Sequence, residues 1–253
     1  MKNTVLSARK LCKSFAHNGG QIHVLSHIDL ELYENDFTVI MGASGSGKST
    51  LLYALSGMDR ATSGEVIYGG KDIVKMKEKE RAKLRYTDFG FIFQQMHLVS
   101  NLTLFENVAV SGYLNKSRSA AEVRQRADKL LEQMSVSHIK NHLPTQVSGG
   151  EQQRCAVARA VINSPKVLFA DEPTGALNRK NTSEVLNLLT ELNSEGQSVL
   201  MVTHDMRAAL RANRILYIGD GKIIGELTLP PYASQDERSR ETQVNAWLTS
   251  LEW

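Results

Sequence analysis

Residues 37–50 read Phe37-Thr-Val-Ile-Met-Gly-Ala-Ser-Gly-Ser-Gly-Lys-Ser-Thr50. The run opens with a short, mainly apolar segment that predicts a strand buried on both faces. It continues into the spacing GxxxxGKS, after which Leu51, Leu52 and Leu55 recur with the period of a helix. A glycine-rich loop of this spacing, placed between a strand and a helix, typically binds the phosphates of a nucleotide. The segment therefore predicts a nucleoside triphosphate site on an α/β fold.

The residue types in this loop each have a chemical reason. Glycines curl the backbone so that successive N–H groups point at phosphate oxygens. The helix behind the loop adds the positive end of its dipole, the lysine reaches the β- and γ-phosphates, and the serine after it is placed to hold Mg²⁺. The predicted nucleotide ligands are Gly42, Ala43, Ser44, Gly45, Ser46, Gly47, Lys48, Ser49 and Thr50.

Two further apolar runs, Val167–Ala170 and Val199–Thr203, have the same character, and a helical pattern follows each. Buried strands that alternate with helices predict a mostly parallel core sheet. The N-terminal residues to about 33 and residues 65–68 predict a smaller antiparallel sheet. Residues 215–224 predict a hairpin that turns at Asp220-Gly221.

Residues 95–164 differ in kind, because they carry helical periodicity without a comparable apolar strand. Ser119 and Glu122 form a capping-box pattern that predicts the start of a helix. We interpret the segment as a helical subdomain inserted into a nucleotide-binding domain over residues 1–229. Residues 230–253 predict a partly helical tail whose apolar face either packs on its own domain or docks on a partner.

Composition excludes several classes of protein. A net charge of +3 gives no basic stripe of the kind that binds nucleic acid. No run approaches the roughly 18 apolar residues of a membrane helix, and Arg9, Lys10 and Lys13 interrupt any signal-peptide core, so we expect a cytoplasmic chain. The two cysteines, Cys12 and Cys155, fit neither a disulfide scaffold nor a zinc site.

Two carboxylates follow the second apolar run. Asp171 and Glu172 stand where a parallel strand delivers side chains to the ligand-binding edge of its sheet. We expect Asp171 to hold Mg²⁺ and Glu172 to polarise an attacking water as a general base. For such a pair taken alone, a solvated loop carboxylate is the alternative.

A second anion site is predicted at Ser148-Gly149-Gly150, just before a helix with an apolar face. Backbone N–H groups and a hydroxyl at a helix start suit phosphate oxygens. Because the site lies inside the helical insertion, we expect it to serve the phosphate-binding loop of a second subunit rather than its own.

Taken in order, these motifs resemble the ATP-binding subunits of ABC (ATP-binding cassette) transporters, from about residue 6 to about residue 227. The resemblance rests on the Walker A loop Gly42–Thr50, the Q-loop Gln94 in Gly90-Phe-Ile-Phe-Gln94, the signature Val147–Glu151, the Walker B strand with Glu172, the D-loop Gly175–Asn178 and the switch histidine His204.

The resemblance implies a head-to-tail homodimer that closes on two ATP molecules. Each ATP would lie between the Walker A loop of one subunit and Ser148-Gly149-Gly150 of the other. Glu172 would activate the water, His204 would contact the γ-phosphate, and Gln94 would sense Mg²⁺ and the membrane partner. Outside this context His204 would be a capping or surface residue, since Asp205 after it has the character of a helix cap.

The same resemblance indicates which residues would hold Mg²⁺ and which residue would stack on the adenine ring. Ser49, Gln94 and Asp171 would hold Mg²⁺. Phe15 occupies the position of the aromatic residue that stacks on adenine. Core packing is the alternative for a phenylalanine on a strand.

Two positions depart from the commonest family pattern. The signature ends in Glu151 where glutamine is usual, and the D-loop has Asn178 where aspartate is usual. Asparagine keeps an acceptor oxygen but loses the charge, so we expect altered communication between the two ATP sites. Glu172 is present, and we therefore still expect hydrolysis. The loop, Walker B and Q-loop sequences are most similar to the lipoprotein-release, macrolide-export, cell-division and bacitracin-resistance branch.

These motifs and the resemblance predict an ATPase subunit that drives a separate transmembrane permease. We expect it to act at the inner face of the cell membrane, in export, lipoprotein release or peptide-antibiotic resistance. The alternative is a non-transport ABC ATPase that regulates a cell-envelope or ribosomal machine. A P-loop kinase gives no reason for the signature.

Overall fold

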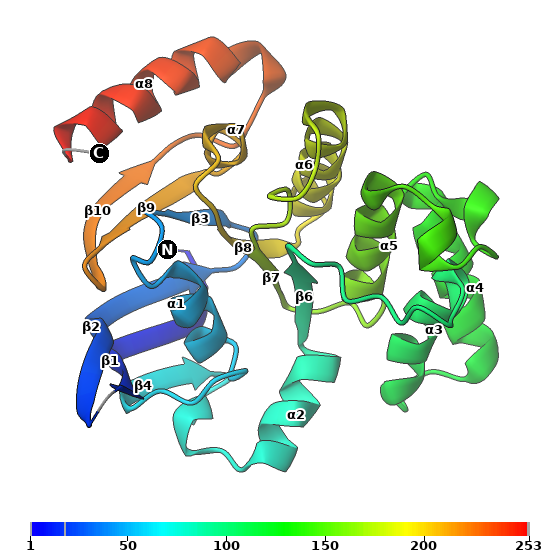
Figure 1. Ribbon diagram of the computed structural model, residues 1–253, viewed down its shortest axis with the longest axis horizontal. Helices are drawn as coiled ribbons and strands as arrows, with labels where there is room; N and C mark the ends of the chain where they lie inside the picture. The colour runs from blue at the N-terminus through cyan, green and yellow to red at the C-terminus, as the bar shows by residue number, and fades with distance from the viewer. Residues whose placement is uncertain (1, 18, 252–253) are drawn as a thin grey trace.

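The computed structural model describes residues 2–17 and 19–251, and residues 252–253 of the predicted tail lie outside this part. Two sheets with helices around them make up the fold (Figure 1). The strands are β1 (Thr4–His17), β2 (Gly20–Tyr33), β3 (Phe37–Met41), β4 (Ser63–Tyr68), β5 (Lys71–Asp72), β6 (Phe89–Phe93), β7 (Val167–Asp171), β8 (Ser198–Val202), β9 (Arg214–Gly219) and β10 (Lys222–Thr228). The α-helices are α1 (Lys48–Leu55), α2 (Glu78–Thr87), α3 (Leu104–Leu114), α4 (Ala120–Gln133), α5 (Gly149–Val161), α6 (Arg179–Ser194), α7 (Met206–Ala209) and α8 (Glu237–Ser250).

The core sheet explains the apolar runs of the sequence. Within the described residues it has the strand order β10-β9-β3-β8-β7-β6. All neighbours from β9 to β6 pair in parallel, and β10 pairs with β9 antiparallel. Every residue of β3, β7 and β8 is buried, as expected for strands covered on both faces. The predicted mostly parallel core sheet is confirmed.

The smaller antiparallel sheet is confirmed as well, in the order β2-β1-β4-β5. The β9–β10 hairpin turns at Asp220-Gly221, where φ is 47° and 70°. Two successive left-handed residues define the turn type whose twist matches that of paired strands.

The core sheet separates two hydrophobic cores. Val39 and Met41 of β3 face one core, while Ile40 between them faces the other. The second core also holds Leu51, Leu52 and Leu55 of α1 and apolar residues of the antiparallel sheet. Helix α1 therefore lies between the two sheets, as Figure 1 shows.

The segment predicted to be helical contains α3, α4 and α5, which lie beyond β6 (Figure 1). The predicted capping box at the start of α4 is confirmed. The Ser119 hydroxyl accepts a hydrogen bond from Glu122 N at 3.3 Å, and the Glu122 carboxylate accepts one from Ser119 N at 2.7 Å. Leu104 and Val108 of α3 belong to the same core as β3 and α6, so this bundle is continuous with one face of the sheet.

Helix α8 packs on the chain's own domain. Val244 and Leu248 are fully buried in the core that contains Val39, and Trp247 and Leu251 pack against that core. Between the two interpretations of the tail, the structure shows the apolar face covered within the chain. No helix in the described ranges combines the length and the apolar character needed to cross a membrane.

One buried arginine anchors α8. Arg240 is 3% exposed and donates hydrogen bonds to the carbonyls of Leu210, Pro230 and Ala212. Its guanidinium also lies 5.6 Å from the centroid of the Tyr232 ring. Because Leu210 and Ala212 follow α7, Arg240 connects α8 to the segment that begins at His204.

Candidate functional site

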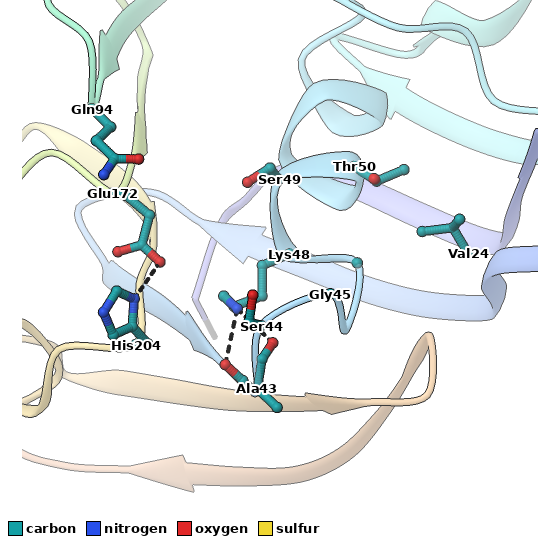
Figure 2. Close-up of a pocket in the computed structure, with 12 residues that line it drawn as sticks. Val24, Ala43, Ser44, Gly45, Lys48, Ser49, Thr50, Gln94, Glu172 and His204 are labelled. Carbon is teal, nitrogen blue, oxygen red and sulfur yellow. Dashed lines mark hydrogen bonds and ion pairs between the residues drawn. The ribbon is translucent and has the colours of Figure 1, made fainter. Parts of the chain in front are cut away.

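The phosphate-binding loop and three other predicted site residues meet where parallel strands end. The glycine-rich loop follows β3, Gln94 follows β6, Glu172 follows β7, and Thr203 and His204 follow β8. Carboxyl ends of parallel strands share one edge of a sheet, where ligands bind. A cavity of about 690 Å³ opens there, and Figure 2 shows Gln94, Glu172 and His204 across it from Lys48 and Ser49. Its lining residues are Val24, Gly42, Ala43, Ser44, Gly45, Gly47, Lys48, Ser49, Thr50, Gln94, Glu172 and His204.

The loop requires glycine for two separate reasons. Gly47 has φ 101° where α1 begins, a left-handed conformation that favours glycine. At Gly42 a Cβ atom would lie 2.3 Å from the carbonyl oxygen of Ile218, so the backbone of β9 approaches too closely for any side chain. The Ser46 hydroxyl oxygen is shielded from solvent and has no hydrogen-bond partner among the described residues. A buried hydroxyl without a partner is consistent with a loop that binds a ligand able to form a hydrogen bond with it.

Lys48 lies folded over this loop. Its ammonium donates to the carbonyls of Gly42 at 2.9 Å and Ala43 at 2.8 Å, and the residue is 8% exposed. Burial lowers the pKa of Lys48, while the nearby Glu172 and Asp171 carboxylates oppose that shift. The site thus contains one cation that two carboxylates help to keep charged.

Glu172 is held in one orientation. Its carboxylate accepts hydrogen bonds from the Thr203 hydroxyl at 3.0 Å and pairs with His204 Nδ1 at 2.9 Å. Its backbone has φ 45°, and its N–H donates to Val202 O at 3.0 Å. Since Thr203 Oγ1 also accepts from Asp205 N at 3.0 Å, one hydroxyl links the carboxylate to the start of α7. The predicted cap is confirmed, since Asp205 accepts from Arg207 N at 2.9 Å.

Asp171 lies beneath the cavity lining rather than in it. It is 9% exposed, and its Oδ1 accepts a hydrogen bond from the Ser49 hydroxyl at 2.7 Å. A hydroxyl and a carboxylate oxygen at this separation are the hard ligands that Mg²⁺ prefers, usually with phosphate oxygens completing its shell. The donor set present therefore fits the predicted metal.

Gln94 is exposed and crosses to the D-loop. A Cβ atom on Gly175 would lie 2.9 Å from Gln94 Nε2, so the missing side chain leaves room for the amide. Asn178 serves as the N-cap of α6, because its side chain accepts a hydrogen bond from Asn181 N at 2.9 Å. An aspartate would make the same cap, so the neutral residue keeps the local fold.

The predicted signature motif is separate from the cavity lining. Ser148 and Gly149 are exposed at the start of α5, and among the described residues neither of them nor Gly150 lines the cavity. The Ser148 hydroxyl donates to Glu151 Oε2 at 2.6 Å and accepts from Glu151 N at 3.4 Å. Sequence reasoning missed this capping box, although the spacing of a serine and a glutamate three residues later indicates one.

Phe15 is not a core residue. It is 43% exposed, and the Lys13 ammonium lies 4.6 Å from its ring centroid. Phe15 pairs with Ile22 across the β1–β2 hairpin, and directly paired residues share one face of a sheet. Ile22 lines a second cavity of about 400 Å³ that includes Ala43 to Ser46 of the loop. Phe15 is therefore on the face that adjoins the loop.

Two residues of the site escaped the sequence interpretation. Tyr53 donates to Asp171 Oδ2 at 2.5 Å, and Thr203 holds Glu172. Tyr53 lies four residues after Ser49 on α1, a spacing that places both side chains on one face of a helix. A tyrosine in the otherwise aliphatic run Leu51–Leu55 is the signal that indicates it.

Comparisons with known proteins agree with this geometry. Residues 25–175 match the family model described as ABC transporter. The chain is 42% identical over 222 residues to the Macrolide export ATP-binding/permease protein MacB 1/2 of Paracoccus denitrificans (strain Pd 1222), which covers 88% of this chain and 33% of that protein. The chain thus spans one third of this curated relative.

Two solved structures are also similar. One is the dimeric structure of a post-hydrolysis state of the ATP-binding cassette MJ0796 bound to ADP and Pi, with a TM-score of 0.83 and 36% identity. The other is the dimeric structure of MJ0796, a bacterial ABC transporter cassette, with a TM-score of 0.83 and 37% identity. Each match covers 90% of this chain and 100% of the other.

Proposed function

The chain belongs to the ABC transporter family, and on this premise we propose that it is an ATP-hydrolysing cassette that closes head to tail with a second copy around two ATP molecules. The observation that supports this most strongly is the separation of two anion sites. The loop, Glu172 and His204 surround one cavity, while Ser148 and Gly149 are exposed and do not line it. In the proposed dimer, the second copy brings the start of its α5 to the phosphates.

The carboxylate of Glu172 is the general base of this proposal. It accepts hydrogen bonds from Thr203 and His204, which fix its direction, and a fixed base near an attacking water accelerates proton transfer. His204 is 69% exposed, so it is accessible to a γ-phosphate in the cavity. Lys48 and the loop N–H groups hold the phosphates.

In this proposal Ser49, Asp171 and Gln94 would hold Mg²⁺. Gln94 lies across the cavity from Ser49 (Figure 2). When bound, Mg²⁺ would neutralise negative charge on the phosphate oxygens. Phe15 stacks on the adenine ring, on the strand face that adjoins the loop.

Closure is tested with Ser148→Arg. Arginine at the exposed start of α5 leaves the loop, Glu172 and His204 intact, so ATP affinity of the single chain stays unchanged, but its bulk blocks a second copy from approaching. With ATP and EDTA, light scattering should show a dimer for the wild type and a monomer for the variant. Ser117→Arg, at another exposed serine in the loop between α3 and α4, is the matched control and should dimerise. A Ser148→Arg chain that dimerises like the wild type would refute the proposed interface.

The partner of the closed pair is a transmembrane permease, with the cassettes peripheral at the inner face of the membrane. The relative MacB is named an ATP-binding/permease protein, and this chain matches one third of its length. We propose that ATP hydrolysis by the cassettes drives macrolide export, lipoprotein release or peptide-antibiotic resistance. Co-expression with a candidate permease should move the chain to the membrane fraction; recovery in the soluble fraction with every such permease would contradict this part.

A further inference from the structure

The buried carboxylate of Asp171 receives a hydrogen bond on each oxygen. Ser49 Oγ donates to Oδ1 at 2.7 Å, and the phenol of Tyr53 donates to Oδ2 at 2.5 Å. Both donors come from α1, on one face and one turn apart. The helix that begins with the phosphate-binding lysine therefore also fixes the carboxylate at the end of β7.

These two donors fix the terminal torsion angle of the Asp171 carboxylate. The terminal torsion of an aspartate is broad and nearly two-fold, so a carboxylate held at one oxygen alone keeps rotational freedom. A second donor on the other oxygen removes it. Burial raises the pKa of Tyr53, and the hydrogen bond to Asp171 raises it further, so the phenol stays a donor throughout the neutral range.

We propose that Tyr53 is a positioning residue for the divalent cation: by holding Asp171 Oδ2 it keeps Oδ1 beside the Ser49 hydroxyl, the pair of oxygens at which Mg²⁺ binds with the nucleotide. The inference deepens the proposed function and depends on it. Partners that orient a ligating carboxylate typically change metal affinity by about 10–100-fold when they are removed. Tyr53 thus sets the affinity of the site for its cation without touching the nucleotide.

The test is Tyr53→Phe, which removes a single oxygen and leaves the ring in place. Mn²⁺ serves as the probe in the presence of ADP, which the protein cannot hydrolyse, and its binding is followed by loss of the free-Mn²⁺ electron paramagnetic resonance signal. We expect the Mn²⁺ dissociation constant of the protein–ADP complex to rise about tenfold, at the lower end of that range because Ser49 and the phosphates remain. ADP affinity in EDTA should be unchanged.

Tyr68→Phe is the matched control. Tyr68 also donates to a carboxylate, Asp88, at 3.0 Å, and burial likewise raises the pKa of its phenol. Asp171 accepts a hydrogen bond from Ser49, which lines the nucleotide cavity, whereas the side-chain partners of Asp88, Tyr68 and Thr87, do not line it. This variant should bind Mn²⁺ like the wild type. If the two tyrosine hydrogen bonds only stabilise the fold, the Mn²⁺ dissociation constant should change equally in both variants.

Each outcome has one meaning. A selective loss of Mn²⁺ affinity in Tyr53→Phe supports the inference. Wild-type Mn²⁺ affinity in Tyr53→Phe, or an equal loss in Tyr68→Phe, overturns it while the proposed function stands. A wild-type protein that does not bind ADP overturns the proposed function itself, and the inference with it.

Discussion

Replacing Glu172 by glutamine separates catalysis from binding. Glutamine has nearly the same shape and one acceptor oxygen, so it retains a partner among Thr203 and His204 but cannot take a proton. General-base catalysis contributes about 10²–10⁴-fold, which corresponds to about 3–5 kcal/mol of activation free energy. The lost charge-assisted hydrogen bond costs about 1.5–3 kcal/mol of stability, which a domain of typical stability tolerates. We therefore expect a folded chain whose turnover falls at least about 100-fold.

The assay is phosphate release at saturating ATP, with ATP affinity measured by calorimetry on the same preparation. Affinity should be unchanged, since the phosphate contacts from Lys48 and the loop are intact, and the ATP-loaded variant should remain dimeric. Thermal unfolding shows whether the variant is folded. Turnover close to that of the wild type would remove Glu172 from the role of base, whatever the ATP affinity.

Two further substitutions test other parts of the structure. Lys48→Ala should weaken ATP binding by roughly 10–150-fold, the equivalent of one charged hydrogen bond of about 1.5–3 kcal/mol, and unchanged affinity by calorimetry contradicts its contact with phosphate. Arg240→Ala should lower the free energy of unfolding by about 3 kcal/mol, because three buried carbonyls lose their donor at about 1 kcal/mol each. Urea titration followed by tryptophan fluorescence measures this. Arg238→Ala, at an exposed position of the same helix, should change little, and equal losses in both variants refute the anchoring role.

Features that depend on local sequence were predictable. The parallel core sheet follows from runs such as Val199–Thr203, whose residues are apolar at nearly every position because helices cover both faces. The β9–β10 turn follows from Asp220-Gly221, since few residue pairs accept two left-handed conformations. The capping box at Ser119 is equally local.

Contacts between distant segments were not predictable. Tyr53 and Asp171 are separated by 118 positions, and their hydrogen bond exists only because α1 lies between the two sheets. Ser148 illustrates a different difficulty: one local pattern has two chemical meanings. Its hydroxyl caps α5 and lowers the pKa of the Glu151 carboxyl through their hydrogen bonds. We propose that the same helix start also binds the phosphates held by a second subunit.

The left-handed backbone of Glu172 has a consequence for the timing of catalysis. An L-residue in this conformation costs on the order of 1–2 kcal/mol, and the hydrogen bond from its N–H to Val202 keeps it there. The free-energy cost of orienting the carboxylate is therefore met when the chain folds and not in each catalytic cycle. If Glu172 is the base, as proposed, each arriving substrate meets a preorganised base, and none of its binding energy is needed to assemble one.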